Sequence, residues 1–240
     1  MILKTGRWSE AELDLMIRRA SLLVDPGEKV EFISRQFLDI PYRESTLRGA
    51  MDIGEVLVID LEGVDCFTLL DYIEAMRISA SYGDLAGNVA RVRYRDGKIS
   101  FSSRNHFFTD WRQYNAERVD DVTEAVGCGR AKQTVKMLNL REDGSHFLPG
   151  IEVRRREVCF LPASDLSDCV MAGLRSGDYT GIYSELEGLD ISHAGIIVKK
   201  GSRVYLRHAS SSQLMRRVID EDFMKYVSGK PGLVVLRPKA

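Results

Sequence analysis

The stretch Val64-Asp65-Cys66-Phe67-Thr68-Leu69-Leu70 decides how this chain is interpreted, because it places a cysteine where a helix begins. Asp65 is a suitable N-cap for that helix. A helix N-terminus helps to lower the pKa of a thiol, so the sequence predicts a nucleophilic cysteine in the first turn. Apolar residues continue at the spacing of a single helix face, which should pack against the core: Leu69, Leu70, Ile73, Met76 and Ala80.

Two histidines follow much later, on short strands expected over residues 193–198 and 204–208. The tight connection between these strands, residues 199–202, predicts an antiparallel hairpin. If the turn is centred between residues 200 and 201, His193 and His208 lie opposite each other. Cross-strand partners have β-carbons about 4.5 to 5.5 Å apart, so the two imidazoles are expected side by side.

These three residues together predict a nucleophile with its base. Cys66 would attack, His193 would take the thiol proton, and His208 would fix the orientation of His193. An imidazolium beside the sulfur would lower the thiol pKa further. The free N–H of Cys66 at the helix start would stabilise an oxyanion. Taken alone, each of these residues could instead be structural, Cys66 as a small buried side chain and the histidines as ordinary strand residues.

Composition permits such a site and excludes several other classes of protein. The chain has 240 residues, 44% of them hydrophobic, and a net charge of -1, which suits one large domain over residues 1–240 without general attraction to nucleic acid. No apolar run approaches the roughly 20 residues of a transmembrane helix. Residues 1–8 do not resemble an intact secretory signal, so either the protein stays inside the cell or a leader was removed.

The four cysteines (Cys66, Cys128, Cys159 and Cys169) are irregularly spaced, and the sequence leaves their redox state open. No paired short spacing of the C-x-x-C or H-x-x-x-H kind is present. We therefore expect neither a metal nor another cofactor.

The predicted order of elements is helices first and strands last, which is an α+β arrangement. A helix is expected over residues 10–23, and a second helix carries Val30, Ile33 and Phe37 and ends before Pro41. A short apolar segment follows at 56–61. Asp96-Gly97 predicts a hairpin between strands at 90–95 and 99–101. Residues from about 88 to 165 are interpreted as an insertion. Further strands are expected at 178–183, 193–198, 204–208 and 233–236.

Several sequence blocks resemble the NlpC/P60 cysteine peptidases and, more narrowly, the bacterial DUF1460 family, described as N-acetylmuramoyl-L-alanine amidase-like. The blocks are 37–42 (Phe-Leu-Asp-Ile-Pro-Tyr), 64–68, 174–178 with 192–196, 207–210, 104–111 and the closing 235–238. The resemblance spans nearly the whole chain. It implies a papain-like α+β fold, a helix-borne nucleophile packed on a C-terminal antiparallel sheet or barrel, and the roles given above to Cys66, His193 and His208.

The resemblance also implies a substrate and a compartment. Members mostly act outside the cytoplasm on peptidoglycan peptides, so muropeptides are the expected partner and the periplasm or the exterior the expected location. The position after the nucleophile is Phe67, where the wider superfamily often has a small or polar residue. Five residues are candidates for substrate binding: Tyr42, Asp65, Arg104, His106 and Trp111. Each has a structural alternative, Asp65 as a helix cap and the last three as a packing cluster.

Two other functions remain open from the sequence. One is a catalytically silent module that binds peptide or cell wall, and the other is a relative that transfers a lipid acyl group. Rapid alkylation of Cys66 at pH 6 would favour an activated thiolate over the silent module. The acyl-transfer group commonly places histidine before cysteine, whereas this chain has the reverse order.

Overall fold

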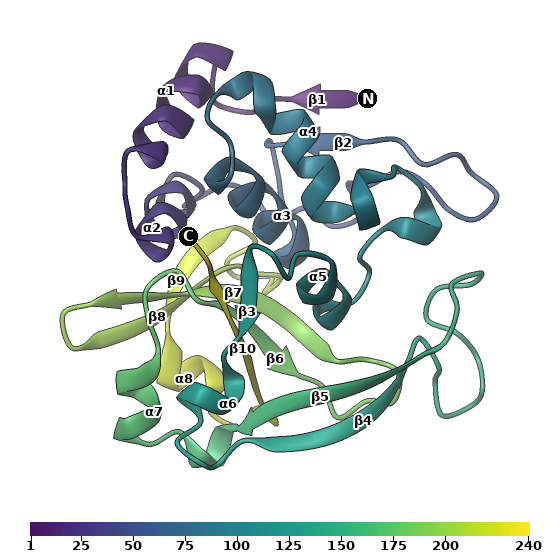
Figure 1. Ribbon diagram of the computed structural model, residues 1–240, viewed down its shortest axis with the longest axis vertical. Coiled ribbons are helices and arrows are strands. Elements are labelled where there is room, and N and C mark those ends of the chain that lie inside the picture. Colours follow the sequence, from purple (N-terminus) through teal and green to yellow (C-terminus); the bar gives the residue numbers. More distant parts are fainter.

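The computed structural model describes residues 1–240, and its helices and strands occupy two layers (Figure 1). Helices α1 to α4 form the upper layer of the figure, and a large antiparallel sheet forms the lower one. The helices are α1 (Glu10–Ser21), α2 (Pro26–Arg35), α3 (Cys66–Arg77), α4 (Tyr82–Arg93), α5 (Phe108–Tyr114), α6 (Thr123–Val126), α7 (Asp168–Gly173) and α8 (Phe223–Val227). The α+β class predicted from the sequence is confirmed.

The large sheet has eight strands in the order β4-β5-β10-β6-β7-β8-β9, with β3 pairing with β10 as well. A separate small sheet joins β1 and β2 in parallel. The strands are β1 (Ile2–Lys4), β2 (Val58–Asp60), β3 (Val119–Asp121), β4 (Lys132–Leu138), β5 (Arg154–Pro162), β6 (Tyr179–Tyr183), β7 (Ile191–Lys200), β8 (Arg203–Ala209), β9 (Val218–Asp222) and β10 (Gly232–Pro238). Strands β6, β7, β8 and β10 confirm the four strands predicted for the last third.

The first helix forms as predicted, and its local chemistry explains why. The Ser9 hydroxyl accepts the N–H of Glu12, and the Glu12 carboxylate accepts the N–H of Ser9, which is a complete capping box. The buried face of α1 contains Leu13, Met16, Ile17 and Ala20. Burial of this stripe against the other helices supplies most of the stability of so short a helix.

The hairpin predicted around Asp96-Gly97 is wrong, because residues 82–93 form α4. Leu85, Val89 and Val92 are buried at helical spacing, and this tertiary burial overrides the alternation of Arg and Val that suggested a strand. Asp96 and Gly97 do have positive φ, at 54° and 67°. That left-handed geometry ends a helix as readily as it joins two strands.

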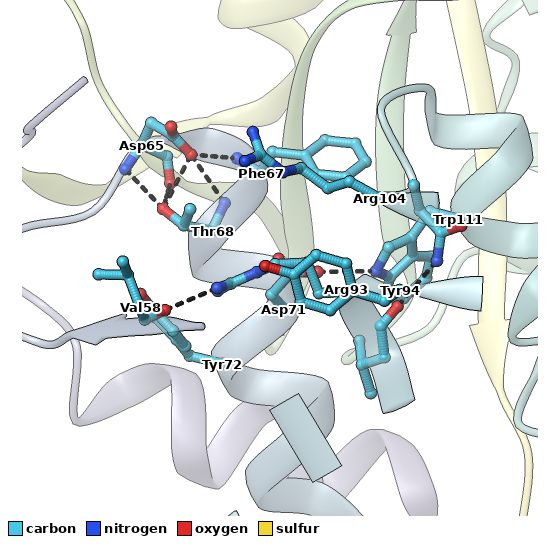
Figure 2. A network of polar contacts seen from close by, with 12 residues as sticks. Val58, Asp65, Phe67, Thr68, Asp71, Tyr72, Arg93, Tyr94, Arg104 and Trp111 are labelled. Carbon is cyan, nitrogen blue, oxygen red and sulfur yellow. Dashed lines mark hydrogen bonds and ion pairs between the residues drawn. The ribbon is translucent and has the colours of Figure 1, made fainter. Parts of the chain in front are cut away.

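A buried polar network holds α4 and α5 on α3 (Figure 2). The Arg93 guanidinium donates to the Asp71 carboxylate at 2.7 Å and to the Val58 carbonyl at 2.6 Å. The Trp111 indole donates to the other oxygen of Asp71 at 3.0 Å. Both members of the ion pair are buried, so each depends on the other for compensation of its charge. The network fixes the orientation of α3, the helix that begins with Cys66.

Strands β7 and β8 form the predicted hairpin in a different register. Ile196 pairs with Arg207 and Lys200 with Arg203, so the turn centre lies one residue later than predicted. If this register is extended along both strands to the histidines, His193 and His208 are diagonal neighbours. The sequence had predicted that they would lie directly opposite each other. Each residue of β7 pairs with a residue of β8 two positions later than predicted. Because side chains in a strand alternate between the two faces of the sheet, both histidines still lie on the same face.

Residues 88–165, interpreted as an insertion, contribute to the same core as the flanking chain through side chains such as Val89, Trp111 and Val158. Their origin as an insertion stays a prediction. A disulfide joins Cys128, after α6, to Cys169 in α7, while Cys66 and Cys159 are free. No helix is long and apolar enough to span a membrane.

Candidate active site

Cys66 is the first residue of α3, and the cap that precedes it sets its position. A single oxygen of Asp65, Oδ1, accepts the backbone N–H groups of Phe67 and Thr68 at 3.0 and 2.7 Å, and the Thr68 hydroxyl donates to it at 2.8 Å (Figure 2). Thr68 Oγ1 in turn accepts the N–H of Asp65. The cap therefore uses the N–H groups of Phe67 and Thr68 and leaves that of Cys66 available at the helix start.

The two histidines from β7 and β8 meet through their rings. His193 Nε2 lies 2.8 Å from His208 Nδ1, and the rings are nearly perpendicular, at 87°. On its far side, His208 Nε2 lies 3.3 Å from the Glu221 carboxylate of β9. Tyr226 of α8 packs beside both imidazoles, with ring centroids 4.9 Å from His208 and 6.0 Å from His193.

Cys66 and His193 line the same small cavity of about 110 Å³. Its other walls are mostly apolar and come from α3, the start of α5 and the start of β7: Phe67, His106, Phe107, Phe108, Leu189, Asp190, Ile191 and Ser192. A second cavity of about 580 Å³ is lined by His193 together with His208, Glu221 and Tyr226. His193 thus lines both cavities.

Burial sets the resting protonation state of this site. It raises the pKa of the Cys66 thiol to about 12, and the adjacent Asp65 carboxylate adds to that shift. The N–H groups of Ala194, Cys66 and Phe67 oppose the shift without overcoming it. Burial likewise lowers the pKa of His193 to about 3, helped by His208 and Lys230. The resting pair is therefore a neutral thiol beside a neutral imidazole.

This outcome reverses the expectation that the helix N-terminus would lower the thiol pKa. A helix terminus contributes roughly 0.3–1 kcal/mol for a nearby charge, which is less than the cost of burying a thiolate without a cation. No imidazolium supplies that cation, because desolvation lowers the pKa of both histidines.

Tyr42, from the predicted Pro-Tyr block, lies beside the thiol. Its backbone bridges to Val64, two residues before Cys66, and the Arg216 guanidinium lies 4.9 Å from the centre of its ring. Desolvation by burial raises the pKa of Tyr42, and the proximity of Cys66 adds to the shift. Asp65 lies next to the thiol as well, with its Oδ1 atom engaged in capping.

The other three candidates for substrate binding occupy different environments. His106 lines the small cavity with Cys66, and its Nε2 is 2.8 Å from the Phe101 carbonyl. Arg104 forms an ion pair with Glu55 and lies over the Phe101 ring. Trp111 is buried, with its N–H bonded to Asp71, so the structure places it in the core and away from any surface that faces a substrate. Of these three, only His106 is brought to the thiol.

Sequence reasoning missed Glu221, Tyr226 and Asp190. Asp190 is fully buried, and its carboxylate accepts the N–H and hydroxyl of Thr109 and the N–H of Ile191. Burial raises its pKa. No spacing in the sequence marks these residues, although Asp190 precedes His193 by only three positions. No group of three or more His, Cys, Asp or Glu side chains is arranged to hold a metal ion.

The fold and site define an α+β protein with a thiol at a helix start and two hydrogen-bonded histidines on an antiparallel sheet. Residues 32–233 match the model of the AmiA-like family, which is described as N-acetylmuramoyl-L-alanine amidase-like. The chain belongs to this family. No curated protein matches it significantly.

Solved structures agree with that assignment. An N-acetylmuramoyl-L-alanine amidase from Bacteroides uniformis is 26% identical, with a TM-score of 0.74 over 90% of this chain and 99% of that one. A Bacteroides fragilis protein, provisionally named a xylanase, is 28% identical, with a TM-score of 0.69 over 85% and 98%. A Legionella pneumophila protein of the DUF1460 family is 17% identical, with a TM-score of 0.79 over 96% and 94%, and shows the shared fold.

Proposed function

We propose that this protein is a cysteine-dependent amidohydrolase that cleaves an amide bond in peptidoglycan peptides. The observation that carries the proposal is the shared cavity of Cys66 and His193, with His193 hydrogen-bonded to His208. The amidase-like family and the Bacteroides uniformis amidase support a cell-wall substrate. The papain-like NlpC/P60 arrangement, with Cys66, His193 and His208 as the triad, is part of this proposal.

Acylation in this scheme begins from the neutral pair. His193 takes the thiol proton as Sγ attacks the carbonyl carbon, and a C–S bond forms while the carbonyl oxygen becomes an oxyanion. The N–H of Cys66, which the Asp65 cap leaves unused, stabilises that oxygen. The C–N bond then breaks, and His193 returns the proton to the leaving amine. The product is a thioester on Cys66.

Deacylation uses the same groups in reverse. A water molecule gives a proton to His193 and attacks the thioester carbon, and the second tetrahedral intermediate expels sulfur, which regains the proton. His208 holds the His193 ring throughout and shares its charge when it is protonated. Because thiol and base are both neutral at rest, proton transfer accompanies attack on the carbonyl.

Two amide bonds fit the proposal: the bond between the muramoyl lactyl group and L-alanine, and a bond within the stem peptide. The cavity of about 110 Å³ beside Cys66 suits a small apolar group such as a methyl. Tyr42 and His106 are the candidates for substrate contact, because both lie near the thiol.

We place the activity in the periplasm or outside the cell. The amidase-like family supports this location, since its expected substrate is the cell wall. The disulfide between Cys128 and Cys169 supports it as well, because such bonds persist in oxidising compartments.

The test is a digest of purified peptidoglycan, read by mass spectrometry. Wild-type protein should release fragments, and folded Cys66→Ala and His193→Ala variants should release them about 10³-fold more slowly or not at all. Cys159→Ala, which removes the other free thiol, should match wild type. A new N-terminal L-alanine on the released peptide would identify an amidase. A new N-terminus further along the stem, with a shortened peptide left on the muramoyl group, would identify an endopeptidase. Release by Cys66→Ala at the wild-type rate would refute the proposal.

A further inference from the structure

Glu221 is a polar group at the site that the cysteine and the two histidines do not account for. It lies on β9, and β8 lies between β9 and the His193 strand in the sheet. Its carboxylate faces Nε2 of His208 at 3.3 Å, and its side chain keeps 36% of its surface exposed. The line of contacts therefore runs from the Cys66 cavity through His193 and His208 to a carboxylate at the edge of the larger cavity.

We infer that Glu221 is a positioning residue that fixes the ring tautomers of both histidines, and thereby the nitrogen with which His193 acts as base. This inference rests on the proposed function. It assigns to Glu221 no contact with substrate, and its effect passes through His208.

The inference follows from which groups can donate. An ionised carboxylate only accepts hydrogen bonds, so Nε2 of His208 must carry a proton to face Glu221. A neutral imidazole then has Nδ1 unprotonated, and that atom can only accept. The partner across 2.8 Å must donate, so Nε2 of His193 carries its proton. Nδ1 of His193 is left as the basic nitrogen.

The charges around the histidines agree with this assignment. Burial lowers the pKa of His208, so both rings are neutral near pH 7, while Glu221 and Asp220 partly oppose that shift. Asp220 is itself bound to Arg207 and Lys200, and neither of its carboxylate oxygens is bonded to His208. Lys230 acts on His193 in the opposite direction.

Tyr226 and Cys66 complete the titratable groups around the pair. Burial raises the pKa of Tyr226, so the phenol stays neutral beside the rings, and Cys66 is a neutral thiol. Glu221 is therefore the carboxylate that faces a histidine nitrogen directly. Without Glu221, either tautomer of His208 can form the hydrogen bond to His193. If His208 carries its proton on Nδ1, it donates to Nε2 of His193, and His193 then carries its own proton on Nδ1, where the base is needed.

Three variants test the assignment in the full chain. Glu221→Ala removes the acceptor and should lower kcat about 10- to 100-fold, with KM within about twofold. Glu221→Gln keeps an acceptor oxygen and should recover most of that loss. Asp222→Asn is the matched control, because it removes the neighbouring charge, keeps the α8 cap to the Lys225 N–H, and contacts neither histidine.

The pH profile separates positioning from general structural support. Glu221 raises the pKa of His208. A protonated His208 must donate from Nδ1 to Nε2 of His193, which leaves His193 with its own proton on Nδ1 and therefore without a base. Loss of the carboxylate should therefore move the acidic limb of kcat to lower pH in both Glu221 variants, and leave it in place in Asp222→Asn. The inference would be overturned if Glu221→Ala kept both the kcat and the acidic limb of wild type. It would also be overturned if the acidic limb of Asp222→Asn moved to lower pH by as much as that of the Glu221 variants.

A second measurement needs no substrate. The chain has four histidines, so ¹⁵N NMR of the imidazoles can assign each tautomer in resting protein. We expect a proton on Nε2 of both His193 and His208 in wild type, and mixed tautomers in Glu221→Ala. A proton on Nδ1 of resting His208 would overturn the inference whatever the activity. If Cys66→Ala keeps full activity while the NMR result holds, the proposed function fails and the tautomer assignment stands.

Discussion

The protonation state of Cys66 leads to a prediction that differs from the behaviour of an activated thiolate. Burial raises the pKa of Cys66 to about 12 and that of Cys159, the other free cysteine, to about 11. At pH 8 the thiolate fraction is then about 10⁻⁴ for Cys66 and about 10⁻³ for Cys159. Since only the thiolate reacts, both should label slowly with iodoacetamide, and Cys66 more slowly than Cys159.

The substitution Asp65→Asn tests how much the Asp65 charge contributes to the raised pKa of Cys66. The cap uses one oxygen of Asp65, which an asparagine amide can replace, so stability should change by no more than a few tenths of a kcal/mol. The carboxylate charge that raises the thiol pKa is lost, and each pKa unit recovered increases labelling about tenfold. Asp65→Ala should instead cost about 1 kcal/mol, because the cap is removed.

The assay is peptide-resolved mass spectrometry of the labelled protein between pH 6 and 9. Cys159 is an internal reference, and Cys128 and Cys169 stay unlabelled while their disulfide is intact. Labelling of Cys66 should rise about tenfold per pH unit over the whole range. A plateau for Cys66 between pH 6 and 8 would refute the reasoning, because it would reveal a thiolate already formed at neutral pH.

Three further predictions concern stability. Removal of the disulfide by Cys128→Ser with Cys169→Ser should cost about 4 kcal/mol in urea unfolding, since it closes a loop of 41 residues; a loss below about 1 kcal/mol would contradict this. Burial lowers the pKa of His106 to about 4, so the unfolded chain binds more protons between pH 6.5 and 4, and stability should fall as pH falls through that window. His106→Gln should reduce that slope, and His193 and His208, whose pKa values are also lowered, should account for what remains. An unchanged slope would contradict the assignment to His106. Arg93→Met should cost about 3–5 kcal/mol by leaving Asp71 unpaired, and adding Asp71→Asn should recover part of the loss; no recovery would exclude charge burial as the cause.

Local signals in the sequence predicted those parts of the fold in which neighbouring residues decide the outcome. The Ser9–Glu12 capping box and the apolar stripe of α1 are contained within one helix. Asp65 caps α3 as its position suggested. The prediction of a hairpin at 90–101 was wrong because the alternating Arg and Val residues fit both the two-residue period of a strand and the 3.6-residue period of a helix. Only contact with α3 and α5 decides between the two. Arg93 illustrates the point, since its partners lie 22 and 35 residues away.

The sequence by itself determined the first helix, the capped cysteine helix and the four strands predicted for the last third of the chain, because these depend on short-range periodicity and capping. Tertiary structure alone decided the register that makes the histidines diagonal, the burial that keeps Cys66 neutral, and the arrival of Glu221 at His208. Each of these depends on how separate segments pack. The helix start that drew attention to Cys66 does not ionise it, because desolvation in the folded protein outweighs the favourable field of a helix terminus.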